Sequence, residues 1–183
     1  MPNSPRNRYD RVAISFHWIV GAAVIAQIAF GWTLGEIERG TPARALATNL
    51  HKSTGLLLAA LILARLLWRL RHQPPPYAAD LPAWQLRAAR FGHLLLYVCM
   101  IVMPVSGYLA SNFSKHGIRF LNLVQLPPWG PDDPVVYRWL NGTHDLTAVL
   151  FSALVVGHIL VALHHRLIAH DSVLSRMSLF RER

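Results

Sequence analysis

The stretch LNGTHDLTAVLFSALVVGHILVALHH, from Leu140 to His165, is apolar enough for a membrane-spanning helix, yet it contains four histidines. From residue 146 to 165 no side chain carries a fixed charge, which is about the length needed to cross the hydrocarbon core of a bilayer. His144 and His158 are 14 residues apart, close to four whole helical turns. Both rings therefore lie on one face of the helix, about 21 Å apart along its axis. Ionisable residues inside a membrane are rare and usually functional. This stretch therefore predicts a transmembrane helix whose histidines form a binding site.

Three other apolar runs complete the pattern. Residues 12–35 and 91–114 are uncharged over 24 residues each, and a shorter run begins near Leu50 and is interrupted at Arg65. The first run is too long for the apolar region of a signal peptide, and no A-x-A cleavage site follows it. We therefore expect an all-α integral membrane four-helix bundle, a single domain over residues 1–183. Its predicted helices span residues 12–36, 49–70, 90–112 and 143–166.

Charge and cysteine usage narrow the class further. The formal net charge is +9, but the charges fall between apolar runs and form no basic face of the nucleic-acid-binding kind. Twelve of the 18 positive residues lie on the side of the two tails and the middle loop, which predicts that both termini are cytoplasmic. Cys99 is the one cysteine, so an internal disulfide, a CxxC pair and a CxxCH covalent haem site are all excluded, and a buried thiol is expected.

Matching depths pair the histidines across helices. His17 lies six residues after Arg11, and His158 lies eight residues before Arg166, both near the cytoplasmic side. His51 and His144 are expected to open the second and fourth helices on the opposite side. We therefore predict an inner pair, His17 with His158, and an outer pair, His51 with His144. A histidine taken singly could instead bond to a neighbouring helix.

Two imidazoles that face each other across a bundle core form an axial ligand set for haem iron. A zinc or copper site is disfavoured because two histidines per level leave a tetrahedral ion short of ligands. Arg65 follows His51 by 14 residues, so it lies on the same face but about 21 Å deeper, near the inner pair. Its guanidinium could bind a haem propionate in bidentate geometry, or it could extend to the lipid headgroups. We favour the propionate.

The remaining histidines give weaker signals. His93 follows Arg90 by three residues and is expected at the membrane interface, where it could contact a propionate or a quinone or have no specific role. His164 and His165 end the fourth helix, where they can reach water. The others are expected in loops: His72, His116 and His170. Between residues 115 and 141 the segment PPWGP, residues 127–131, forbids a regular helix.

The sequence resembles the prokaryotic cytochrome b561 family, small di-haem membrane cytochromes that react with quinones. The resemblance covers nearly the whole chain and depends on the order and spacing of several motifs, together with the H-x13-H pair of the fourth helix. The motifs are YDRVAISFHW (9–18), NLHKSTGLLL (49–58), ARLLWRL (64–70), FGHLLLYVCMIVMPVSGY (91–108) and ALHHRLIAHDSVLSRM (162–177).

This resemblance implies two b-type haems, ligated by His17, His51, His144 and His158. It also implies electron transfer with ubiquinone in the bacterial inner membrane and, for some members, oxidation of superoxide. Two histidine ligands leave no open iron position, so outer-sphere electron transfer is expected. Three outer residues could form an attractive positive surface for superoxide, or they could be ordinary loop charges: Lys52, Arg119 and Arg138.

Two other functions stay open at this point. The chain could be the haem-bearing membrane anchor of a larger oxidoreductase, of the hydrogenase or formate dehydrogenase type, and receive electrons from a protein partner. It could also be a non-redox membrane protein, such as a metal or haem transporter. Short outer loops with no evident docking domain favour a free-standing cytochrome.

Overall fold

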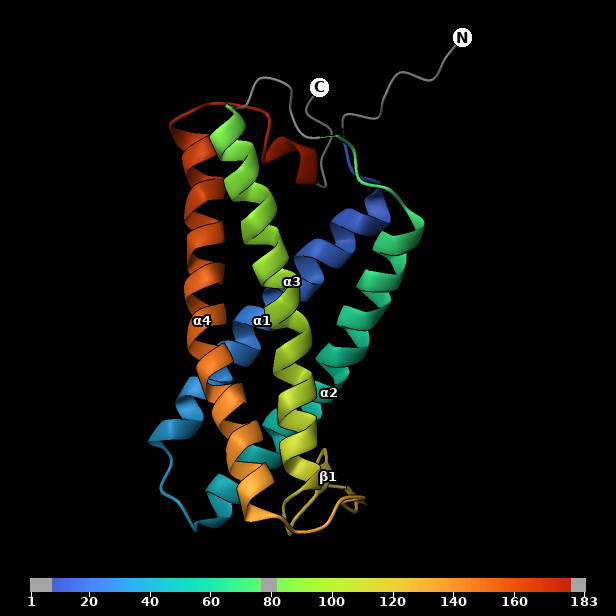
Figure 1. Ribbon diagram of the computed structural model, residues 1–183, viewed down its shortest axis with the longest axis vertical. Coiled ribbons are helices and arrows are strands. Elements are labelled where there is room, and N and C mark those ends of the chain that lie inside the picture. The colour runs from blue at the N-terminus through green and yellow to red at the C-terminus, as the bar shows by residue number, and fades with distance from the viewer. Residues whose placement is uncertain (1–7, 77–81, 179–183) are drawn as a thin grey trace.

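The computed structural model describes residues 8–76 and 82–178 (Figure 1). Its four long helices are α1 (Arg11–Glu36), α2 (Pro42–Arg71), α3 (Ala83–Asn112) and α4 (Pro134–Leu167). All four are long and apolar enough to cross a membrane. A short hairpin, β1 (Ile118–Phe120) and β2 (Val124–Leu126), joins α3 to α4, and the 3-10 turn η1 (Ser175–Met177) follows α4. The predicted four-helix membrane bundle is confirmed.

Three helices begin seven to nine residues earlier than predicted, and for α2 and α4 the reason is that capping residues lie outside the apolar runs. The Thr41 hydroxyl accepts a hydrogen bond from the backbone N–H of Arg44, and Pro42 occupies the first turn of α2. The Asp133 carboxylate accepts from two N–H groups of α4, whose first residue is Pro134. A polar N-cap followed by proline is a strong helix start. The prediction that His51 and His144 open their helices is therefore wrong, since both lie several turns inside.

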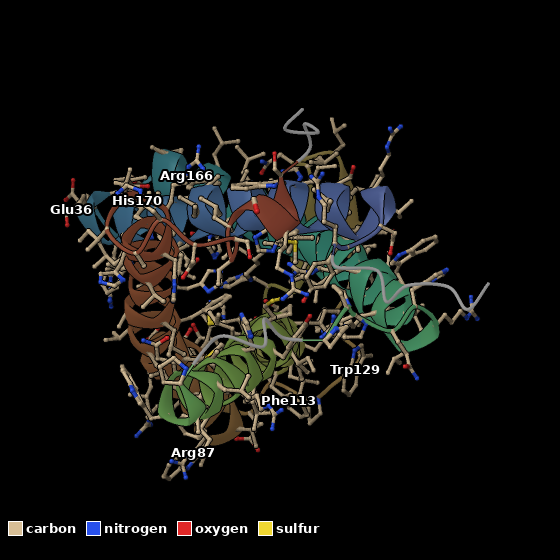
Figure 2. The ribbon with its side chains drawn as sticks, turned by 90° about the horizontal axis from the view of Figure 1, so that it is seen from above. Glu36, Arg87, Phe113, Trp129, Arg166 and His170 are labelled. Atoms are coloured by element: carbon tan, nitrogen blue, oxygen red, sulfur yellow. The ribbon has the colours of Figure 1, made fainter. Side chains whose placement is uncertain are left out.

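The helices pack as two antiparallel pairs, α1 with α2 and α3 with α4, with further contacts between α2 and α3. Figure 1 shows α3 and α4 side by side, with α1 and α2 crossing behind them. We call the end where α1 begins and α4 ends the tail end, and the opposite end, which carries the hairpin, the loop end. Viewed along the bundle, the four helices surround a central layer of side chains, while Arg87 lies at the outside (Figure 2).

The hairpin covers the loop end of α2 and was not predicted from the sequence. The N–H of Leu121 donates to the hydroxyl of Ser53 at 2.7 Å, and the Ser53 side chain is fully buried. The N–H of Arg119 donates to the side-chain oxygen of Asn49 at 3.2 Å. After the hairpin, residues 127–132 form no helix, as PPWGP predicts.

A cluster of buried apolar side chains occupies the middle of the bundle. Its buried members are Val20, Val24, Ile62, Cys99, Met100 and Phe151. Phe151 is seven residues from His144 and seven from His158, hence about 10 Å along the helix from each. The cluster therefore separates the two histidine levels. Cys99 is a free thiol, 2% exposed, as predicted.

Candidate metal centres

The structure brings the four histidines together as two separate pairs. The ring centroids of His17 on α1 and His158 on α4 lie 6.1 Å apart, with the ring planes at 68°. The centroids of His51 on α2 and His144 on α4 lie 6.3 Å apart, with the planes at 87°. Each pair thus joins α4 to one of the two helices on the other side of the bundle.

Both separations fit one ion held between two imidazole nitrogens. A metal–imidazole bond is about 2.0–2.1 Å, so two rings on opposite sides of one ion have centroids about 6 Å apart. The rings are too far apart to hydrogen-bond directly and too close to admit another side chain between them. In the described ranges, no group of three or more His, Cys, Asp or Glu side chains is placed to hold a metal. The donor set therefore suits an ion whose remaining ligands come from a macrocycle.

His144 is oriented for ligation by the backbone of α3. Its Nδ1 donates to the carbonyl of Met103 at 3.0 Å, which leaves Nε2 with a free lone pair. Gly107 lets the ring approach this closely, because a Cβ at that position would lie 3.0 Å from both Cε1 and Nδ1 of His144. Met103 precedes Pro104, the proline inside α3. This arrangement is the usual one for a histidine that binds a metal through Nε2.

His51 has a different environment, provided by α1. The side-chain amide of Gln27 donates to the backbone carbonyl of His51 at 2.8 Å and lies 3.2 Å from Nδ1. The Thr54 hydroxyl donates to the amide oxygen of Gln27 at 2.8 Å. Gly31 leaves room for the ring, since a Cβ there would lie 3.2 Å from Cε1 of His51. Side chains, rather than backbone, therefore control this ligand.

Arg65 lies at the level of the inner pair, as its spacing predicts. Its guanidinium donates to Nδ1 of His17 at 3.2 Å and lies 5.9 Å from the centroid of the Tyr97 ring. The side chain is thus directed into the bundle rather than towards lipid headgroups. Because a guanidinium can only donate, Nδ1 of His17 accepts a hydrogen bond in this arrangement.

His93 lies inside α3, ten residues after the first residue of the helix, Ala83. Its ring lies 5.6 Å from that of His158, so it adds a third imidazole at the inner level. His165 bonds to Asp171, which lies beyond the end of α4. His72 is not a free loop residue, since it caps α2 and stacks on Trp68 at 3.8 Å.

The three positive residues considered as an attractive surface for superoxide differ in how exposed their side chains are. Lys52 is partly buried, and its ammonium donates to the carbonyl of Gly117 at 3.0 Å, which ties α2 to the hairpin. The side chains of Arg119 and Arg138 are exposed near the loop end. A positive surface at that end therefore depends mainly on the two arginines.

The residues that hold the rings of the outer pair were not predicted from the sequence. Gln27 could have been found, because it is an amide in the middle of the otherwise apolar run 12–35. Thr54 follows His51 by three residues, which places the two on one helix face. The carbonyl of Met103 carries no such signal, since a backbone acceptor can be recognised only after the helices are packed.

Comparison with known proteins shows which family the chain is similar to. The family described as prokaryotic cytochrome b561 matches residues 8–178. Cytochrome b561 homolog 2 of Escherichia coli (strain K12) is 32% identical over 96% of this chain and 93% of its own length. Cytochrome b561 homolog 1 of the same strain is 26% identical over 93% and 97%. A protein of Yersinia pestis named probable superoxide oxidase CybB is 27% identical over 93% and 95%.

Proposed function

Since the chain belongs to the prokaryotic cytochrome b561 family, a group of multi-pass bacterial inner-membrane cytochromes, we propose that it binds two haem b groups and exchanges electrons with ubiquinone. We further propose that superoxide is an electron donor at the outer face. Bound haem would supply reversible one-electron exchange without an open iron position for oxygen. The observation that carries the proposal is the pair of ring separations, 6.1 and 6.3 Å, each of which suits one ion between two imidazoles.

His17 and His158 would hold the inner group, and His51 and His144 the outer group. At the outer level the Met103 carbonyl already fixes the proton of His144 on Nδ1, so that Nε2 is available to the metal. At the inner level Arg65 donates to Nδ1 of His17 and must turn away before that nitrogen can carry a proton. A carboxylate within reach would give the guanidinium a stronger, bidentate partner. We therefore propose that Arg65 pairs with a propionate of the inner group.

Haem content and spectra of four single variants test the ligand assignment. We expect His17→Ala and His158→Ala each to lose the same haem, and His51→Ala and His144→Ala each to lose the other. His116→Ala, at an exposed position near the hairpin, is the matched control and should retain both. If one variant from each pair lost the same haem, the ligand assignment would be refuted. A colourless wild-type protein would refute the proposed function.

A reconstituted system tests the substrates. Purified protein in liposomes with ubiquinone should form ubiquinol when superoxide is generated outside, and His51→Ala should abolish this. The family resemblance also allows a membrane-anchor role in a larger oxidoreductase. Co-purification with a soluble redox subunit, without quinone reduction by the chain alone, would favour that alternative.

A further inference from the structure

Gln27 is an uncharged amide in the middle of a membrane helix, and its side chain contacts His51. The amide nitrogen donates to the carbonyl of His51 at 2.8 Å and lies 3.2 Å from Nδ1 of the ring. The amide oxygen accepts from the Thr54 hydroxyl at 2.8 Å. Gly55 makes space for the amide, because a Cβ there would lie 3.2 Å from its nitrogen. The amide is therefore held between α1 and α2 by contacts at both of its ends.

The surroundings of this amide are apolar. Gln27 and Thr54 lie in a groove of about 360 Å³ between α1 and α2. Its other lining residues are Ala23, Ala26, Phe30, Leu57, Leu58 and Leu61. Leu57 is 53% exposed, so the groove opens towards the lipid-facing side of the helices. Inside a bilayer a polar group must find its partners within the protein, which leaves His51 and Thr54 as the partners of Gln27.

The orientation of the amide is coupled to the position of the proton on His51. A ring that binds metal through Nε2 carries its proton on Nδ1, and that proton needs an acceptor. The two ends of an amide have nearly the same shape, so a turn of the amide places its oxygen opposite Nδ1. The nitrogen then faces the Thr54 hydroxyl, which can accept from it while donating to the Leu50 carbonyl at 2.9 Å. The carbonyl of His51 gives up its contact with the amide and retains its partner within the helix.

We propose that Gln27 is a positioning residue that accepts the Nδ1 proton of His51 when this ring binds iron, and so lowers the reduction potential of the outer centre. An accepted Nδ1 proton makes the imidazole a stronger electron donor, which favours the oxidised metal. This inference depends on the proposed function, because it requires haem at the outer pair. Gln27 is the informative residue for a test, since the matching acceptor of His144 is a backbone carbonyl that no substitution removes.

Redox titration of the purified holoprotein tests the inference, because it gives the midpoint potential of the outer centre. This midpoint is identified by comparison with His51→Ala, a variant that retains only the inner centre. Gln27→Glu has nearly the same shape and is a stronger acceptor, so the outer midpoint should fall. A tenfold change in the ratio of oxidised to reduced centre corresponds to about 59 mV for one electron, and we expect a fall of about that size. Gln27→Leu leaves the proton without an acceptor, so the outer midpoint should rise.

Two further variants make the test specific. Thr54→Val keeps the shape of the side chain but releases the far end of the amide, and should raise the outer midpoint by less than Gln27→Leu. Gln125→Glu, at an exposed position of the hairpin, introduces the same charge and should leave both midpoints unchanged. Equal or absent shifts in the Glu and Leu variants, with two haems retained, would overturn the inference while leaving the proposed function intact. If the Glu variant loses the outer haem, the absence of an upward shift in both Gln27→Leu and Thr54→Val overturns it instead.

Discussion

At the scale of single residues, two glycines set how closely the helices can bring each outer ring to its partner. Gly31 on α1 faces His51, and Gly107 on α3 faces His144. Any larger residue at either position would place a Cβ within 3.2 Å of an imidazole atom. The glycines therefore determine ring placement without contributing a polar group.

Replacing Gly107 with alanine should displace the ring of His144, because the new methyl group would meet two of its atoms at 3.0 Å. Changes next to a ligand typically weaken metal retention by about 10- to 100-fold, and we expect a loss of this order for the outer haem alone. Haem content after dialysis against apo-myoglobin measures it. Gly92→Ala is the matched control in the same helix, since its Cβ would meet nothing within 4 Å. Equal haem retention in both variants would contradict the steric role of Gly107.

At the scale of helices and strands, the structure shows which features of the fold are encoded locally. Long uncharged runs identified all four helices, because a bilayer imposes a minimum apolar length. The starts of α2 and α4 were misplaced, since the signals at Thr41 and Asp133 lie among polar residues outside those runs. The hairpin was missed for another reason. Its strands have three residues each, and it is held by the N–H of Leu121 on Ser53, a partner 68 positions away in the sequence.

The segment after α4 is fixed by several long-range bonds. The indole of Trp18 donates to the carbonyl of Met177 at 2.8 Å, and Arg176 donates to the carbonyl of Pro76. Asp171 bonds to His165 and accepts from the N–H of Val173. Partial burial opposes ionisation of Asp171, but these hydrogen bonds outweigh it and hold its pKa below the usual value of 3.8.

The low pKa of Asp171 predicts a pH dependence of stability. A carboxyl group with a lowered pKa in the folded state stabilises the protein above its unfolded pKa, and this contribution is lost as the pH falls through the folded value. Asp171→Asn should therefore reduce the melting temperature in detergent at pH 7. The loss in the free energy of unfolding should be below about 1 kcal/mol, because the pair of Asp171 and His165 is partly exposed. Below about pH 4 the difference from the wild type should shrink. A difference that grows on acidification would contradict the role given to the carboxylate.

At the scale of the whole molecule, the pairing of the histidines was accessible from the sequence because depth in a membrane is nearly one-dimensional. Counting residues from the charged ends of each run placed His17 near His158 and His51 near His144, and the structure brings these rings together. The hydrogen-bond partners of the rings were less accessible, since a backbone acceptor such as the Met103 carbonyl reaches His144 across a helix–helix contact. Periodicity gives the face of a helix but not the neighbour that it meets.

The charge distribution predicts how the bundle is inserted. The tail end carries the start of α1 and the end of α4, and it has the majority of the positive residues. We expect both termini in the cytoplasm, so a green fluorescent protein fused to the C-terminus should fluoresce and alkaline phosphatase at the same position should be inactive. An active phosphatase fusion would reverse the assignment of the inner and outer pairs.

The cluster of buried apolar side chains around Phe151, between the two histidine levels, has an energetic consequence. Its buried members in the described part of the chain are apolar side chains and one thiol, so these side chains form no chain of hydrogen-bonding groups along which protons could follow an electron. Negative charge that moves from one level to the other is then not neutralised on the way and is displaced across part of the bilayer. Such displacement costs or releases up to about 2.3 kcal/mol per charge for every 100 mV of transmembrane potential. Under the proposed two-haem function, turnover of such a bundle would be sensitive to the voltage of the cell, and turnover in one direction would contribute to that voltage.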